Sequence, residues 1–350
     1  MCVCFFFHAS HDVVKIVRSP LQHEHARTDM AEFVFNFCVG EDVKDGGVTE
    51  REEVSKPLPE GRPCTSNSAV SNQVVDSEEI PITPFHSLLM NHVTPSRFQI
   101  SDLLEILYVD VASVEKVAKN ETQRSDFGKK PGTPEIGFAS LLELSNSFHS
   151  DLIPGVYEGG LKIWECAFDL VEYLATSEIQ FSGRSVLELG CGAGLPAIYA
   201  LMKGAREVHF HDYNPEVINY VTIPSVLFNM KLLKSHHSDP MTLPQCKFYS
   251  GDWSSLIRLI PSGHYDVILT SETIYSLTSQ PKLLAALKHL LCSKKAGVAY
   301  VAAKSYYFGV GGSVGSFVKL VKQDGYFNIE KCHIVNCEVA REILIMKPQL

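Results

Sequence analysis

The chain has 350 residues, 45% of them hydrophobic and 20% charged, with a formal net charge of −9. This composition indicates a globular protein of one large or two modest domains, and the acidic balance argues against a broad nucleic-acid-binding surface. The ten cysteines include no C-x-x-C and no paired Cys/His metal spacing, so we expect reduced thiols and no metal site. Since no apolar run reaches transmembrane length, we expect no membrane span.

The N-terminal part of the chain divides into three segments. We interpret Met30 as the usual start and residues 1–29 as an N-terminal extension or an artefact of the gene model. Residues 30–84 are predicted to be largely disordered, because a segment rich in Glu, Asp, Ser, Pro and Gly buries too little apolar surface to offset its ordering entropy. Residues 85–146 are predicted to form an accessory N-terminal region, with order returning at Phe85.

A gate-like segment precedes the first long helix. Residues 151–165, which we call the gate segment, are rich in glycine, aromatic and acidic residues and lead into a helix predicted over 161–175 from apolar residues at three- and four-residue steps. Trp164 either packs over a ligand or fills the core. Glu165 either caps the helix N-terminus or faces a positively charged ligand.

The stretch at 185–196 reads as a buried strand, a glycine turn and a helix start. Gly190, Gly192 and Gly194 form G-x-G-x-G, whereas dinucleotide enzymes use G-x-G-x-x-G/A. Glu188 precedes the turn, and a carboxylate there suits a positively charged cofactor such as S-adenosylmethionine better than a pyrophosphate. The pattern resembles the first motif of the seven-strand methyltransferases. The alternatives are a plain glycine hinge or a dinucleotide oxidoreductase.

Two further strands end in candidate cofactor residues. Residues 207–212 end at Asp212, about twenty residues after the glycines, where an acid accepts hydrogen bonds from ribose hydroxyls. Tyr213 could pack on the adenine face, although Asp212 could also cap the helix after it. After the strand at 246–249, Asp252 is a candidate contact to the adenine amino group, or a loop residue beside a core tryptophan.

The C-terminal part of the chain supplies the candidate catalytic residues. A fourth strand at 265–270 is followed by Glu272 and Tyr275, which the crevice rule for open α/β sheets places beside the ligand. Helices are predicted at 281–291 and 313–323. Strands at 297–303, 327–335 and 339–346 complete an inventory of seven strands with an antiparallel end. We therefore predict an α/β, Rossmann-like fold.

The motifs at 155–165, 189–192, 271–275 and 307–312 together resemble the protein-histidine N-methyltransferase family. The similarity runs from about residue 147 to the C-terminus, which we take as the S-adenosylmethionine-dependent methyltransferase domain, 147–350. The resemblance implies S-adenosylhomocysteine as product and, as substrate, a basic large-subunit ribosomal protein methylated on the tele nitrogen of a histidine. It implies cofactor contacts by Ile163, Trp164, Glu165, Cys166, Ala167, Gly190, His211, Asp212, Tyr213, Gly251, Asp252, Trp253 and Ser271. The pattern of the glycine turn itself adds Glu188 and Gly192 to these candidates.

The expected chemistry is a displacement at the sulfonium methyl. Since a neutral imidazole nitrogen already has a lone pair, we expect Glu272 to hold the other ring nitrogen, with Tyr275 or Tyr307 shaping the pocket. Glu272 could instead stabilise its own turn. The alternatives are a lysine methyltransferase of the same fold and an inactive fold that acts as a ribosome-assembly binding protein. We expect a monomer without direct nucleic-acid binding, located in the cytoplasm and the nucleus or nucleolus.

Overall fold

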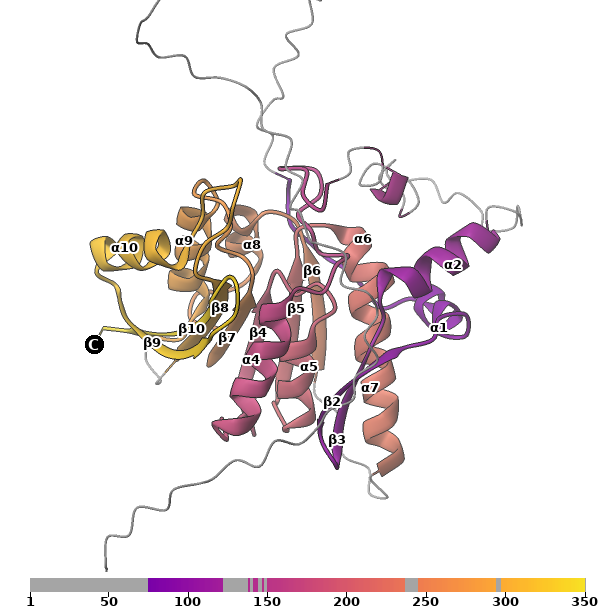
Figure 1. The fold of residues 1–350 in the computed structure, drawn as a ribbon. Helices are drawn as coiled ribbons and strands as arrows, with labels where there is room; N and C mark the ends of the chain where they lie inside the picture. Colours follow the sequence, from indigo (N-terminus) through magenta and orange to yellow (C-terminus); the bar gives the residue numbers. More distant parts are fainter. Residues whose placement is uncertain are drawn as a thin grey trace, which may run out of the picture. The chain divides into compact units, whose positions relative to one another are not determined.

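The computed structural model describes residues 75–121, 138, 141–143, 147, 150–236, 245–293 and 297–349. At its centre is an eight-stranded sheet of order β1-β6-β5-β4-β7-β8-β10-β9 (Figure 1). In chain order the strands of this sheet are β1 (Glu78–Glu79), β4 (Ser185–Leu189), β5 (Glu207–Asp212), β6 (Gln245–Ser250), β7 (Val267–Ser271), β8 (Val298–Lys304), β9 (Phe327–Val335) and β10 (Arg341–Pro348).

The middle of the sheet is parallel and its margins are antiparallel. Neighbouring strands from β6 to β8 all pair in parallel. β1 pairs antiparallel with β6, and β10 runs antiparallel between β8 and β9. Every residue of β4 and β8 is buried. Their near-continuous apolar sequences are therefore those of strands covered on both faces by helices.

Helices cover both faces of the sheet (Figure 1). In chain order they are α1 (Pro84–Met90), α2 (Val111–Glu121), α4 (Glu165–Thr176), α5 (Leu195–Met202), α6 (Pro215–Val217), the π-helix η1 (Ile218–Thr222), α7 (Ile223–His236), α8 (Trp253–Leu259), α9 (Gln280–Leu290) and α10 (Val314–Asp324). One apolar core unites α4, α5 and α7, and a second unites α8, α9 and α10. The sheet thus lies between two helical layers.

The helix after β5 is irregular around Pro224. Pro224 has no amide hydrogen to donate to the preceding turn. The π-helix η1 lies immediately before this proline, and there the Ile223 N–H donates to the carbonyl of Ile218, five residues back. A π-turn of this kind accommodates the proline without ending the helix.

The accessory region braces α7. Strands β2 (Ser96–Ser101) and β3 (Leu104–Tyr108) form a separate two-stranded hairpin. The Asn229 side chain bonds both the N–H (3.0 Å) and the carbonyl (2.6 Å) of Leu107, and the Ser225 hydroxyl accepts from the Val109 N–H at 2.9 Å. Because these groups are buried, leaving them unpaired would be costly. The hairpin is therefore joined to the larger fold through polar residues of α7.

The seven predicted strands and the antiparallel C-terminal end are confirmed. Several features differ from the prediction. Structure begins before Phe85, because β1 adds to the sheet and Ile80 is buried. The helix α8 was not predicted. The interpretation of residues 1–29 as an extension, and of residues 30–74 as disordered, lies outside the described residues.

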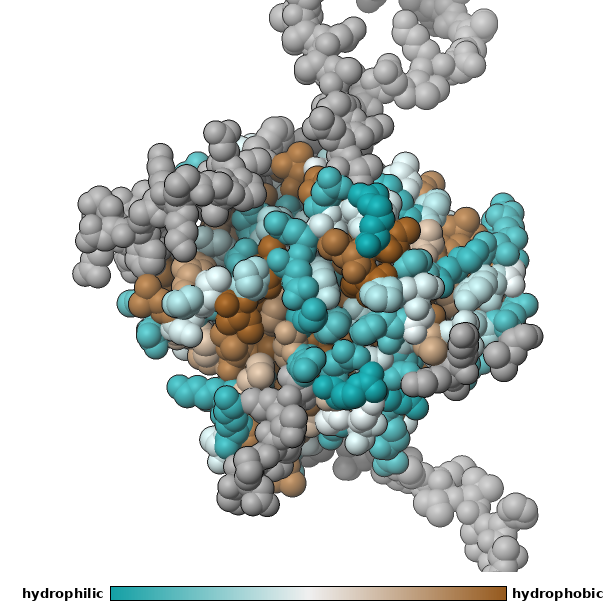
Figure 2. Space-filling view, turned by 180° about the vertical axis from the view of Figure 1, so that it is seen from behind, coloured by the Kyte–Doolittle hydropathy of each residue, from teal (hydrophilic) through white to brown (hydrophobic). Residues whose placement is uncertain are grey.

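The described surface is mixed in polarity. Figure 2, which views the face opposite to that of Figure 1, shows apolar residues in separate patches between hydrophilic ones. No helix within the described residues has the length and apolar character needed to cross a bilayer.

Candidate functional site

A cavity of about 1010 Å³ lies at the carboxyl ends of the parallel strands, where open α/β sheets bind ligands. We call it the main cavity. Its lining contains most of the predicted site residues. These are Ile163, Trp164, Ala167, Gly190, Gly192, Asp212, Tyr213, Gly251, Asp252, Trp253, Ser271, Glu272 and Tyr275.

The glycine turn after β4 leaves no room for side chains. Gly190 has a φ of +63°, and a Cβ there would lie 2.6 Å from Cγ2 of Thr273. Gly192 has a φ of +51°, and its Cβ would lie 3.2 Å from the carbonyl oxygen of Gly160. Glycine is required at both positions for backbone conformation and for space. The turn therefore exposes bare backbone to a ligand in the main cavity.

Asp212 is buried at the end of β5 and faces the same turn. Its carboxylate accepts hydrogen bonds from the N–H groups of Gly192 (2.9 Å) and Asn214 (3.3 Å). Burial raises the pKa of Asp212 to about 6, although these backbone hydrogen bonds oppose the shift. A desolvated carboxylate of this kind is suited to accept hydroxyl donors from a ligand.

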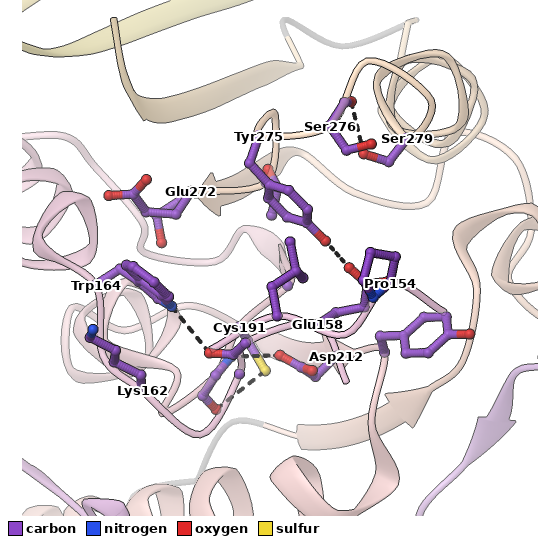
Figure 3. A pocket seen from close by; sticks show the side chains of 18 of the residues that line it. Pro154, Glu158, Lys162, Trp164, Cys191, Asp212, Glu272, Tyr275, Ser276 and Ser279 are labelled. Carbon is purple, nitrogen blue, oxygen red and sulfur yellow. Dashed lines mark hydrogen bonds between the residues drawn. The ribbon is translucent and has the colours of Figure 1, made fainter. Parts of the chain in front are cut away.

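Hydrogen bonds hold the gate segment against the main cavity. Asn214 donates its side-chain amide to the Val156 carbonyl at 2.7 Å and accepts from the Glu158 N–H at 3.1 Å. Trp164 donates its indole N–H to the Gly159 carbonyl at 3.1 Å. In Figure 3 a dashed line starts at the nitrogen of the labelled Trp164 ring. The half-buried Trp164 ring therefore forms part of the cavity wall rather than the core.

The loop after β6 is closed by residues from the N-terminal side of the chain. Asp252 caps α8 by accepting from the Ser254 N–H at 2.8 Å, and it pairs with Lys282 at 2.6 Å. The Asp252 N–H donates to the Val75 carbonyl at 3.1 Å. Gly251, with a φ of +111°, lies so close to Ser77 that a Cβ would be 2.6 Å from its Cα. Residues 75–77 thus complete this corner of the site.

Glu272 is the centre of a buried charged cluster. Its carboxylate accepts a hydrogen bond from the Tyr307 hydroxyl at 2.6 Å and lies 3.7 Å from the Lys304 ammonium. Lys304 also pairs with Glu165 at 3.1 Å. Glu272 has a φ of +59°, a conformation that non-glycine residues adopt at an energetic cost and that is common at functional sites.

The protonation of Glu272 is set by opposing effects. Burial raises the pKa of Glu272, while Lys304, the Cys166 thiol and the Tyr307 hydroxyl act to lower it, and the net shift is upward. Burial also raises the pKa of the Tyr307 phenol well above its usual value, and Glu272 adds to that shift. Tyr307 therefore remains a neutral hydrogen-bond donor.

Five predicted residues do not line the main cavity. They are Glu165, Cys166, Glu188, His211 and Tyr307. Glu188 is fully buried beneath the turn, where it accepts from the Ala197 N–H at 2.9 Å and thereby stabilises the start of α5. His211 contacts the Gly251 carbonyl through Nε2 at 3.0 Å. Tyr307 lies behind Glu272, so it positions that carboxylate instead of shaping the wall.

Three residues at this site were missed by the sequence reasoning. Glu158 lines the main cavity and accepts a hydrogen bond from Tyr275, with the two side chains directed at each other in Figure 3. Lys304 ends β8 and so could have been found by the same crevice rule that identified Glu272. Lys282 lies on α9, and no sequence signal links it to Asp252.

The charge of the main cavity fits a cationic cofactor. Four carboxylates line it, against two lysines, and these residues are Glu158, Asp212, Asp252, Glu272, Lys162 and Lys282. Lys282 is neutralised by Asp252, and Lys162 by Asp151 at 2.9 Å. The remaining negative charge matches the sulfonium and ammonium groups of S-adenosylmethionine. The glycine turn, which has no side chains, lets this cofactor come close to the protein backbone.

Comparisons with known proteins identify the family. Residues 154–309 match the family described as lysine methyltransferase. The histidine protein methyltransferase 1 homologue of Rattus norvegicus is 34% identical over 90% of this chain and 98% of the rat protein. The chain belongs to the histidine protein methyltransferase 1 family. The homologue from Dictyostelium discoideum is 45% identical over 49% of this chain and 52% of its own length.

Family membership confirms the predicted enzyme class. The chain is a methyltransferase whose methyl donor is S-adenosylmethionine and whose product is S-adenosylhomocysteine. Among solved structures, magnesium protoporphyrin IX methyltransferase from Synechocystis PCC 6803, with bound SAH, is 11% identical over 67% of this chain and 100% of that chain, with a TM-score of 0.39.

Proposed function

We propose that this enzyme transfers a methyl group to the tele nitrogen of a histidine in a basic large-subunit ribosomal protein, and so tunes ribosome assembly or translation. The names of its relatives support histidine as the target. The observation that carries the proposal is the buried Glu272 carboxylate, which faces the main cavity with Tyr307 and Lys304 behind it. A carboxylate held in this position can accept a hydrogen bond from the N–H of a neutral imidazole.

The chain's own residues account for the orientation of the target. The cofactor, when bound, supplies an electrophilic methyl group on a sulfonium. Gly190, Gly192 and Asp212 would hold it on the glycine-turn side of the main cavity. Glu272 would accept the N–H of the target ring, which fixes the tautomer and stabilises positive charge as it develops. Because the attacking nitrogen already bears a lone pair, positioning is the main catalytic requirement.

The mouth of the main cavity suits a protein substrate. Val156, Leu277 and Phe308 are large apolar side chains that remain exposed near it, and Leu277 and Phe308 are more than half exposed. Exposed apolar groups beside a site are typical of surfaces that bind a partner. The net charge of −9 complements a basic partner.

Mass spectrometry tests the proposal directly. The ribosomal protein is incubated with S-adenosylmethionine and either wild-type enzyme or Asp212→Ala. We expect one added methyl group mapped to a histidine, absent with the variant. No transfer despite measurable cofactor binding would reject the ribosomal substrate.

A lysine target is the second candidate, because the family description for residues 154–309 names lysine methyltransferases. A lysine ammonium must lose a proton before it can attack, so this reaction demands a base that a neutral histidine does not need. Methylation mapped to a lysine in the same experiment would replace the histidine proposal while keeping the fold and the cofactor.

Cofactor affinity is expected to fall in acid because of Asp212. With a pKa of about 6, only roughly a tenth of this carboxyl is ionised at pH 5, so binding that needs the ionised form weakens about tenfold between pH 7 and pH 5. Calorimetric titration at both pH values measures this. Asp212→Asn should bind more weakly and without this pH dependence. Equal wild-type affinities at pH 5 and pH 7 would contradict the assignment.

Lys304→Met is expected to shift the pH profile of methyl transfer. Lys304 lowers the pKa of Glu272, so its removal raises that pKa further and moves the acidic limb of the rate profile to higher pH. A merely structural role would lower activity equally at all pH values. The profile of kcat, measured from pH 5.5 to 9, distinguishes the two.

We further propose that the enzyme acts as a monomer in the cytoplasm and the nucleus or nucleolus, without direct nucleic-acid binding. A basic substrate that assembles into ribosomes would be met in those compartments. Size-exclusion chromatography with light scattering and imaging of the tagged full chain test the two parts separately.

A further inference from the structure

A second cluster of polar side chains lies away from the main cavity, at the amino ends of the parallel strands. Glu207 is the first residue of β5, and His209 follows two residues later on the same side of the strand. His264 lies in the segment that leads into β7. The three residues line a separate cavity of about 250 Å³, and none of them lines the main cavity.

The three side chains are close enough to share one ion. Nε2 of His209 lies 3.8 Å from one carboxylate oxygen of Glu207, and Nε2 of His264 lies 3.4 Å from the other. One ligand atom from each residue falls within 4.8 Å of the others. Ligands about 2.0–2.1 Å from a tetrahedral zinc ion are roughly 3.3 Å apart, so small side-chain rotations suffice.

His209 is already oriented as a metal ligand. It is 3% exposed, and its Nδ1 lies 2.8 Å from the Tyr265 hydroxyl. When Nδ1 donates its proton to that hydroxyl oxygen, Nε2 keeps its lone pair, and this nitrogen lies within 4.8 Å of ligand atoms of Glu207 and His264. Among the described residues, this Nε2 and that of His264 have no hydrogen-bond partner. A hydrogen bond from the other ring nitrogen, which fixes the orientation of the ring, is typical of histidines that ligate metals.

The neighbouring cations do not occupy the cluster. Arg206 pairs with one Glu207 oxygen at 2.9 Å, which leaves the other oxygen, the one nearer His209, to act as a ligand. Lys247 pairs with Glu79 at 3.2 Å on the rim of the same cavity. The centre of the cluster therefore contains two imidazole nitrogens and a carboxylate.

We propose that Glu207, His209 and His264 form a binding site for a zinc-type dication. Two imidazoles and a carboxylate are a donor set that suits zinc, and the cavity leaves room for water as the fourth ligand. The ion would link β5 to the segment before β7, which also supplies Tyr265. It would brace the end of the sheet opposite the methyl-transfer site. The sequence predicts no metal site, because it contains no paired Cys/His metal spacing, and His209 and His264 lie far apart in the chain.

Zinc binding by the full chain tests this site. The protein is stripped with a chelator, reloaded with Zn²⁺ and dialysed against metal-free buffer. Wild type is then expected to retain one more equivalent of Zn²⁺ than His264→Ala or Glu207→Gln, measured by plasma mass spectrometry. His264 is partly exposed, and Glu207→Gln preserves side-chain shape, so both variants should fold. His92→Ala, which changes an exposed histidine elsewhere, is the matched control and should bind like wild type.

The visible spectrum of bound Co²⁺ distinguishes metal binding at this site from metal binding by cysteines. Co²⁺ bound by nitrogen and oxygen gives visible bands without thiolate charge transfer, and these bands should disappear in His264→Ala. Tyr265→Phe should weaken binding by about tenfold, as expected for loss of the hydrogen bond that orients the His209 ring. Zn²⁺ should raise the Tm of wild type but not of His264→Ala. Equal stoichiometry and equal cobalt spectra in wild type, His264→Ala and Glu207→Gln would overturn the proposal.

Discussion

Glu272→Gln is expected to lower kcat for methyl transfer by about 100-fold while leaving cofactor affinity within a few-fold of wild type. The amide keeps the shape of the side chain and can still accept from the Tyr307 hydroxyl. It removes the negative charge that stabilises a developing imidazolium. The measurement is single-turnover transfer to the protein substrate, with cofactor binding measured separately.

A matched glutamate controls for the loss of a buried charge. Glu342 is also buried and interacts with Ser305 and Lys331, but it does not line the main cavity. Glu342→Gln should leave kcat within about threefold of wild type, since it lies outside the reacting geometry. If Glu272→Gln behaved in the same way, Glu272 would be a structural residue that holds the turn after β7.

Gly312→Ala is expected to reduce the free energy of unfolding by about 3 kcal/mol. A Cβ at residue 312 would lie closer than 3.0 Å to the carbonyl oxygens of Ile274 and Tyr275, and these backbone atoms cannot rotate away. The Gly312 N–H also donates to the Tyr275 carbonyl at 2.9 Å. Urea unfolding followed by fluorescence gives the change in free energy.

Gly315→Ala is the matched control for that substitution. Gly315 lies three residues away in α10, where the nearest atom to an added Cβ is the Ser313 hydroxyl oxygen at 3.8 Å. Alanine there should stabilise the protein by about 0.5 kcal/mol, because it restricts the unfolded chain. Similar unfolding midpoints for the two variants would show that the loop before α10 can move away from Tyr275.

Local patterns predicted the centre of the fold. The apolar run of β4, the glycine turn and the start of α5 are encoded within a dozen consecutive residues, and the structure confirms them. Asp212, Glu272 and Tyr275 were found because the rule for the carboxyl ends of strands depends only on where a strand ends. The strand β1, in contrast, was not predicted. It consists of two exposed glutamates, and this sequence does not indicate a strand.

The parts that were not predictable depend on distant partners. Neighbouring residues of a strand point to opposite faces, so a one-residue difference separates Asp212, which lines the main cavity, from His211, which does not. The pairing of Lys304 with Glu272 and Glu165 arises only when β8, β7 and α4 come together. The same holds for His209 and His264, whose proximity follows from the strand order.

The strand β1 has a consequence for how the chain folds during its synthesis. It lies on the edge of β6, and Ser77 beside it bonds Asp252 although 175 residues separate them. At about 5 to 20 residues per second, the ribosome needs roughly 9 to 35 s to make that intervening stretch. The corner of the site formed by Gly251 and Asp252 therefore closes only after β6 and the loop behind it have been made, when the early-made segment docks on the edge of β6.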